Sequence, residues 1–308
     1  MLDQVLPSPL PLLPPLRRRM DEAARSLLQP VGAQSVDFAA PRGEPALIPP
    51  SSVSWRIFKN PISLFIGGVT AVLLELAEPR VRTGVWEHSS FRSDPVRRLR
   101  RTGLAAMTSV YGPRSAAEAM IARVRRAHDR VRGTTPAGEP YSANDGELLS
   151  WVYATASFGF SGAYSRFVRP LSETDRARLF REGAVTSRLY GATNAPLCVA
   201  ERRALFAAMA PRLERSIIVF EFLDIMQDAP IFPAPLAPLQ RLLLRAAVEV
   251  VPMWVRERLE ITAHGLRPWE EPLVRRAGRL ADRVMLRSSP AVQSCLRLGL
   301  PADYLYRR

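Results

Sequence analysis

Residues that begin and end helices recur along the chain at intervals of about one helix length. Asp94 precedes Pro95, the combination of an N-cap side chain and a first-turn proline that starts many helices. Ser172 is followed three residues later by Asp175, a capping-box spacing, and Gly191 stands where that segment should end. No stretch alternates apolar and polar residues for long enough to predict a sheet. The chain is therefore predicted to be all-α.

Two further capping boxes are predicted by the same spacing. Ser115 with Glu118 would begin one helix, and Asn144 with Glu147 would begin a long apolar helix. The main predicted helices cover residues 94–111, 115–132, 144–168, 172–190, 199–209, 217–226, 236–259 and 270–286. Because no internal repeat or linker divides this series, it predicts a single-domain multi-helix bundle.

The first fifty residues differ in composition from the rest, since ten of the 28 prolines fall there. We predict an extended proline-rich N-terminal arm over residues 1–52, with one short helix at about 21–29, and a helical domain over residues 53–308. In this arm the prolines interrupt the apolar stretch and the arginines follow it, which is unlike a secretory signal. The sequence therefore predicts a cytoplasmic protein.

The formal net charge of +14 constrains the partners less than its size suggests. Lys59 is the only lysine, and the arginines are spread over many predicted helices, a bias typical of a GC-rich genome. No nucleic-acid-binding motif accompanies them, so we expect no nucleic-acid partner and only a weak peripheral attraction to an anionic membrane.

Neither the longest apolar stretch nor the cysteines indicate a specialised class of protein. The stretch 62–77 falls short of the roughly twenty apolar residues that cross a bilayer, which predicts a buried core helix. Cys198 and Cys295 lack metal-ligand spacing and are predicted to be reduced core thiols.

One histidine lies on the apolar face of the helix predicted at residues 115–132. This face consists of Ile121, Val124, His128 and Val131, spaced three, four and three residues apart. A histidine there is either a core residue bonded to a backbone carbonyl or, as neutral imidazole, a ligand for a metal or a haem iron. The spacing alone favours the core residue and leaves both interpretations open.

The preceding helix carries an arginine and a hydroxyl group on one face, because Arg98 and Thr102 are four residues apart. The short connection between the two helices would make them antiparallel neighbours, so this pair could face the same pocket as His128. In the alternative interpretation Arg98 belongs to a solvated arginine-rich face and Thr102 has no role. The spacing alone favours this second interpretation.

Several common catalytic motifs are missing from the sequence. It has no glycine-rich nucleotide loop, no histidine pair with a carboxylate at zinc spacing and no nucleophile elbow. These absences exclude the commonest nucleotide-binding and hydrolytic classes.

Two segments carry a resemblance to a known family: FIGGVTAVLLELAEPRVRTGVWEHSSFRSDPVRRLRRT and VYGPRSAAEAMIARVRRAHDRVRGTTPAGEPYSANDGELLSWVYATASF. The H-x-x-V-x-G element, the Tyr-x-Ala-Asn-Asp turn and the Leu-Leu-x-Trp-Val helix start occur together and in order. From about Val53 to Met226 the chain resembles the catalytic domain shared by rubber oxygenases and MpaB-type oxygenases.

The resemblance implies an all-helical domain that binds haem b and uses dioxygen to oxidise or cleave carbon–carbon double bonds of isoprenoid chains. It implies that His128 is the proximal iron ligand and that Arg98 and Thr102 line the distal side. Trp151 is predicted to contact the cofactor. Together with Phe158 and Phe160 it is predicted to form an apolar wall of the site.

One position departs from the family pattern, because many relatives have His-Pro where this chain has Glu78 and Pro79. Glu78 and Glu87 are both candidates for a general base, and the sequence does not choose between them. We therefore predict a haem-b-dependent oxygenase that acts with dioxygen on an apolar small molecule of the isoprenoid type. The alternative is a non-catalytic helical protein that binds haem or a lipid.

Overall fold

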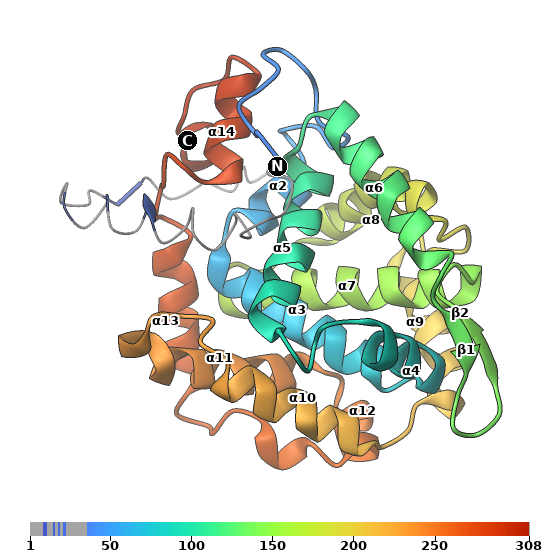
Figure 1. Ribbon diagram of the computed structural model, residues 1–308. Coiled ribbons are helices and arrows are strands. Elements are labelled where there is room, and N and C mark those ends of the chain that lie inside the picture. The colour runs from blue at the N-terminus through green and yellow to red at the C-terminus, as the bar shows by residue number, and fades with distance from the viewer. Residues whose placement is uncertain (1–8, 11–14, 16–17, 19–20, 23–35, 308) are drawn as a thin grey trace.

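The computed structural model describes residues 9–10, 15, 18, 21–22 and 36–307 (Figure 1). Its helices are α2 (Val53–Phe58), α3 (Pro61–Leu76), α4 (Pro79–His88), α5 (Pro95–Tyr111), α6 (Arg114–His128), α7 (Gly146–Phe167), α8 (Glu173–Tyr190), α9 (Val199–Met209), α10 (Ile217–Asp228), α11 (Ala237–Val250), α12 (Met253–Leu259), α13 (Glu271–Ala281) and α14 (Pro290–Arg297). Short 3-10 helices lie at Ala210–Arg212, Ala234–Leu236, Thr262–His264 and Tyr304–Tyr306. Two three-residue strands, β1 (Arg132–Thr134) and β2 (Pro140–Ser142), pair in an antiparallel hairpin. The all-α prediction is confirmed, whereas most of the helix predicted at 21–29 lies outside the described residues.

The helices α3 and α7 cross at the centre of the molecule (Figure 1). At the crossing, a Cβ added to Gly159 would lie 2.3 Å from the carbonyl oxygen of Gly67. A Cβ added to Gly67 would lie 2.7 Å from Cα of Phe160. Only glycine lets the two backbones approach so closely. The fully buried Leu73 and Phe167 belong to the core that surrounds this crossing.

The helix α11 covers another side of α3, so that α3 is enclosed between two helices. The hydroxyl group of Thr70 lies 2.9 Å from the carbonyl oxygen of Ala247 in α11. At the start of α3, the Asn60 side chain accepts hydrogen bonds from two first-turn backbone N–H groups, and its Nδ2 donates to the carbonyl oxygen of Gly278 in α13 at 2.9 Å. These bonds fix the position of α3 against the helices that follow much later in the sequence.

The helices α5, α6 and α8 form a layer on the other side of the crossing (Figure 1). The part of the N-terminal arm that the structure describes packs beside this layer, with Phe38, Leu47 and Ile48 buried. The Arg297 guanidinium donates to the carbonyl oxygens of Phe38 at 2.8 Å and Tyr111 at 2.7 Å. Residues 36–52 therefore pack as part of the folded body.

Two of the predicted helix starts differ from the structure. The N-cap of α6 is Pro113 and makes no side-chain hydrogen bond, so the capping box predicted at Ser115 is wrong. The backbone N–H of Ser115 instead donates to the carboxylate of Glu44 in the N-terminal arm, at 2.7 Å. The cap of α7 is Asp145, one residue after the predicted Asn144.

Other helix ends follow the sequence signals closely. Ser172 and Asp175 form the predicted capping box, and α8 ends at Gly191 in the left-handed conformation with φ of 96°. The helix predicted over 236–259 is divided in two at Val251 and Pro252. Proline lacks the backbone N–H that a continuous helix would need there.

No single helix in the part of the chain that the structure describes is long and apolar enough to cross a membrane. The helices α3 and α4 reach such a length and composition only as a pair bent by 110°. Within this fold α3 is mostly buried, which confirms the prediction of a core helix at residues 62–77.

Candidate functional site

His128 is the last residue of α6, where it is half-buried beside the turn that leads into α7. Its Nδ1 is buried without a well-formed hydrogen bond, as is the neighbouring Oδ1 of Asn144. The Nδ2 group of Asn144 donates to the carbonyl oxygen of Arg125 at 3.1 Å and to the Asp129 carboxylate at 2.7 Å. Because Nδ2 is used in this way, Oδ1 is left as the acceptor beside the ring. This arrangement favours the tautomer with the proton on Nδ1 and a lone pair on Nε2.

The surroundings of His128 favour its neutral form. Burial lowers the pKa of the ring, and the positive charge of Arg98 lowers it further. The interaction with Asn144 and the charge of Asp129 oppose these effects without overcoming them. A neutral imidazole with an unprotonated Nε2 is the form that binds metal ions.

Arg98 and Thr102 lie side by side on α5, as their spacing predicts. The Arg98 guanidinium donates a hydrogen bond to the Thr102 hydroxyl, and that hydroxyl lies 3.0 Å from the backbone carbonyl oxygen of Arg98. Arg98 is half-buried and Thr102 is exposed. The positive charge of Arg98 lowers the pKa of both His128 in α6 and Glu75 in α3.

Glu75 is a site residue that the sequence reasoning did not select. It lies near the end of α3, where burial raises the pKa of its carboxyl group to about 7, with Arg98 and a contact to Thr155 opposing the shift. The hydroxyl group of Thr155 in α7 is 3.4 Å from Oε1 of Glu75. A single acid inside an otherwise apolar helix was the signal that could have identified it, because such a residue needs a polar partner in the core.

Trp151 is completely buried in α7, one helical turn before Thr155. Its indole N–H is buried without a hydrogen-bond partner, which is unusual for a buried tryptophan. The Trp151 ring packs against the Phe206 ring, with 4.9 Å between the ring centroids. Phe158 packs against the Phe206 ring as well, at 5.3 Å. Phe160 instead contacts Phe58 at 4.9 Å, so it belongs to a different part of the core.

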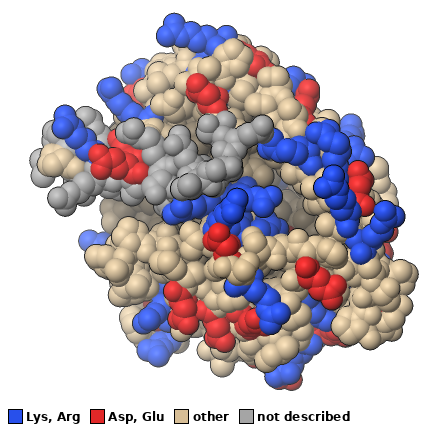
Figure 2. Space-filling view, viewed as in Figure 1, with Lys and Arg blue, Asp and Glu red and all other residues tan. Residues whose placement is uncertain are grey.

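Basic side chains surround the layer that contains His128. They include Arg97, Arg98, Arg100 and Arg101 in α5 and Arg123, Arg125 and Arg126 in α6. Figure 2 shows Lys and Arg side chains gathered over both helices, with the surface hollowed between them. A negatively charged group would be attracted to this hollow.

The two acids considered as general bases have other roles in the structure. Glu78 is completely buried and caps α4, where it accepts hydrogen bonds from the backbone N–H of Val81 at 2.8 Å and from Arg80 at 2.7 Å. Glu87 accepts a hydrogen bond from the Tyr141 hydroxyl at 3.2 Å. Neither carboxylate has a described contact with Arg98, Thr102 or His128.

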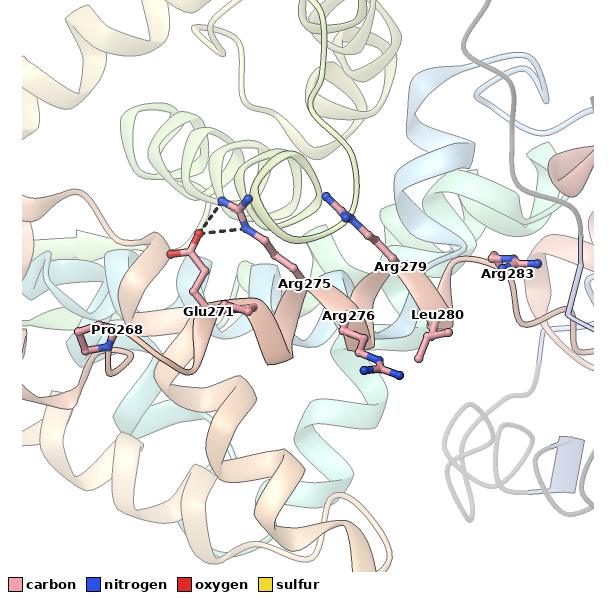
Figure 3. A pocket seen from close by; sticks show the side chains of 8 residues that line it. Pro268, Glu271, Arg275, Arg276, Arg279, Leu280 and Arg283 are labelled. Atoms are coloured by element: carbon pink, nitrogen blue, oxygen red, sulfur yellow. Dashed lines mark hydrogen bonds and ion pairs between the residues drawn. The ribbon is translucent and has the colours of Figure 1, made fainter.

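Two cavities lie away from His128. One, of about 630 Å³, runs along α13, where Figure 3 shows Arg279 and Arg283 farther along the chain than the Glu271–Arg275 ion pair and Arg276 pointing away from that pair. The other, of about 660 Å³, is lined by residues of α7, α8, α9 and α12, including Phe158. His128, Arg98 and Thr102 line neither cavity.

The described residues contain no cluster of three or more His, Cys, Asp or Glu that could hold a metal ion. The fold and the site thus define an all-α protein with a polar centre built around a single histidine.

Comparison with known proteins places the chain in a family. The family described as ER-bound oxygenase mpaB/B'/Rubber oxygenase, catalytic domain, matches residues 55–283. The chain belongs to this family of oxygenase catalytic domains, and the resemblance found in the sequence is confirmed. The matched range contains Glu75, Arg98, Thr102, His128 and Trp151. No curated protein and no solved structure matches the chain.

Proposed function

We propose that this chain is a haem-b-dependent oxygenase that uses dioxygen to oxidise an apolar, isoprenoid-like small molecule. One observation carries the proposal: inside an oxygenase domain, Nδ1 of His128 and Oδ1 of the neighbouring Asn144 are both buried without a well-formed hydrogen bond. Nε of Arg100 in α5 and Nε1 of Trp151 in α7 are further buried polar atoms without a partner among the described residues. Since buried polar groups are nearly always bonded, such atoms call for a functional explanation.

The residues present fit a haem group. A haem iron needs one axial ligand from the protein, and His128 offers a neutral ring whose Nε2 has no hydrogen bond within the described part of the chain. A ligating histidine is usually oriented by a group at its other ring nitrogen; here Asn144 interacts with the His128 ring, although Nδ1 makes no well-formed hydrogen bond. The basic side chains of α5 and α6 suit the propionate groups of a haem.

The iron of a bound haem would supply the electron-transfer chemistry with dioxygen. Around it, the Arg98 guanidinium would donate hydrogen bonds to oxygen atoms that gain negative charge, with Thr102 holding its orientation. The Glu75 carboxyl group, with a pKa of about 7, can both hold and release a proton near neutral pH. Trp151, which is completely buried, would exclude water from the side of the site that α7 forms.

Visible absorption spectroscopy tests the proposal. Protein produced with ample haem should carry a Soret band, and His128→Ala should reduce haem content by at least about tenfold because the axial bond is lost. His264→Ala is the matched control, since His264 lies in a 3-10 helix whose residues are exposed or half-buried. A colourless wild-type protein would refute the proposal.

A second function, haem or lipid binding without turnover, is favoured by one observation. The position where many relatives have histidine is occupied by Glu78, whose carboxylate is engaged in capping α4. Oxygen uptake by the reduced protein with unsaturated isoprenoids separates the two functions. Oxygen uptake that is lost when Arg98 is replaced supports the oxygenase. Stable haem binding with no oxygen uptake for any of the isoprenoids supports the second function.

A further inference from the structure

The cavity of about 660 Å³ is lined by both apolar and basic side chains. The apolar side chains include Phe158, Leu171, Val199, Phe206, Pro252 and Trp254. Its volume lies within the range of small-molecule sites, which are mostly apolar with a few polar groups that fix orientation. The cavity could therefore enclose the body of a hydrophobic molecule.

The basic side chains of the cavity are four arginines, and no acidic residue lines it. Arg166 is neutralised by Glu249 at 3.3 Å and Glu271 at 2.8 Å. The side chains of Arg176, Arg202 and Arg203 make no ion pair with the described residues. The lining of the cavity thus carries positive charge that no described acidic residue compensates.

Arg202 is the most constrained of these arginines. It is half-buried, and its guanidinium lies over the rings of Phe158 at 5.4 Å and Phe180 at 5.3 Å. Burial and the charges of Arg176 and Arg203 lower the pKa of Arg202 to about 10, so the group remains charged at neutral pH. Its N–H donors have no acceptor in the described structure, and a bound anion would supply one.

We propose that this cavity binds an amphiphile with an anionic head group, a carboxylate or a phosphate, on an apolar body. The head group accepts hydrogen bonds from Arg202, while Arg176 and Arg203 add attraction at the exposed side. The apolar body packs along Phe158 and Phe206. Phe206 also contacts Trp151, so one aromatic ring links the cavity to the core around Trp151. The proposal does not depend on haem, since it rests only on the residues that line this cavity.

Isothermal titration calorimetry with premicellar ligands tests this binding. Decanoate and decyl phosphate represent the two anionic head groups, decan-1-ol is the neutral analogue, and inorganic phosphate lacks the apolar body. At least one anionic amphiphile should bind about tenfold more tightly than decan-1-ol and inorganic phosphate, and the tighter of the two identifies the head group. Equal affinity for decan-1-ol and both anions would overturn the proposal.

Three variants connect this binding to the cavity. Arg202→Gln should weaken binding of the anion about tenfold and leave decan-1-ol unchanged. Arg176→Gln, an exposed and therefore structurally mild change, should weaken it about threefold. Arg241→Gln is the control, because Arg241 is exposed on α11 and does not line the cavity. Unchanged anion affinity in both cavity variants, or an equal loss in Arg241→Gln, would contradict the proposed site.

Discussion

The α3–α7 crossing and the α5–α6 layer differ in how their buried polar groups are satisfied. At the crossing, the hydroxyl groups of Thr70 and Ser161 bond carbonyl oxygens at 2.9 Å and 2.6 Å. In and beside the α5–α6 layer, buried atoms of His128, Asn144 and Arg100 have no partner. Buried groups that lack partners reduce stability. We therefore assign the unpartnered atoms of His128, Asn144 and Arg100, together with Nε1 of Trp151 in α7, to function, and the bonded hydroxyl groups of Thr70 and Ser161 to the part of the fold that holds it together.

The largest effect on stability is expected for a substitution at the α3–α7 crossing. Gly159→Val should lower the free energy of unfolding by about 3 kcal/mol, because the new side chain overlaps the carbonyl oxygen of Gly67 and forces the helices apart. Urea denaturation measures the change. Gly103→Ala in α5 is the matched control, since nothing lies within 4 Å of its Cβ, and it should stabilise the protein by about 0.5–1 kcal/mol. A similar loss in both variants would contradict the contrast between the two regions.

A second effect, which depends on pH, is expected at Glu75. Its folded pKa of about 7 exceeds the ordinary value of 4.5, so the folded state binds a proton that the unfolded chain releases between these values. The stability contributed by this group is complete below pH 4.5 and declines as the pH rises towards 7. Glu75→Gln should therefore match the wild type at about pH 4.5 and be more stable by about 3 kcal/mol at about pH 8. A stability difference that does not vary with pH would show that Glu75 is not held in its neutral form.

The smallest effect on stability is expected at Arg98. Arg98→Met should change the free energy of unfolding by less than about 0.5 kcal/mol, because Arg98 has no direct ion pair and the methionine retains most of the apolar packing. The same change should raise the pKa of Glu75 further, since the charge of Arg98 opposes the effect of burial. Carboxyl-carbon NMR titration measures that shift. A large loss of stability would instead assign Arg98 to the structural core.

The sequence predicts the fold best where one local signal is sufficient. The capping box at Ser172 and the glycine end at Gly191 act within a single turn of chain, and both are present in the structure. The start of α6 could not be predicted in this way, because the acceptor for the N–H of Ser115 is Glu44, 71 residues away. The approach of Gly67 to Gly159 also depends on tertiary packing that no local pattern encodes.

In the candidate site, too, contacts within one helix can be predicted from the sequence and contacts between helices cannot. The pairing of Arg98 with Thr102 lies within one helix, and its spacing predicts it. Glu75 and Thr155 come together only when α3 crosses α7, so the sequence gives no sign of their contact. The role of His128 remains a prediction, based on the family and on the unpartnered groups around it.

Chemical rescue of His128 tests the central assignment most directly. His128→Gly removes the ring and leaves space in which free imidazole can take its place. The visible spectrum of the variant with haem should lack the wild-type Soret band and regain it when imidazole is added, because the exogenous ring restores the axial bond. A Soret band in His128→Gly that equals the wild type without imidazole would show that the iron is held elsewhere and would contradict the assignment.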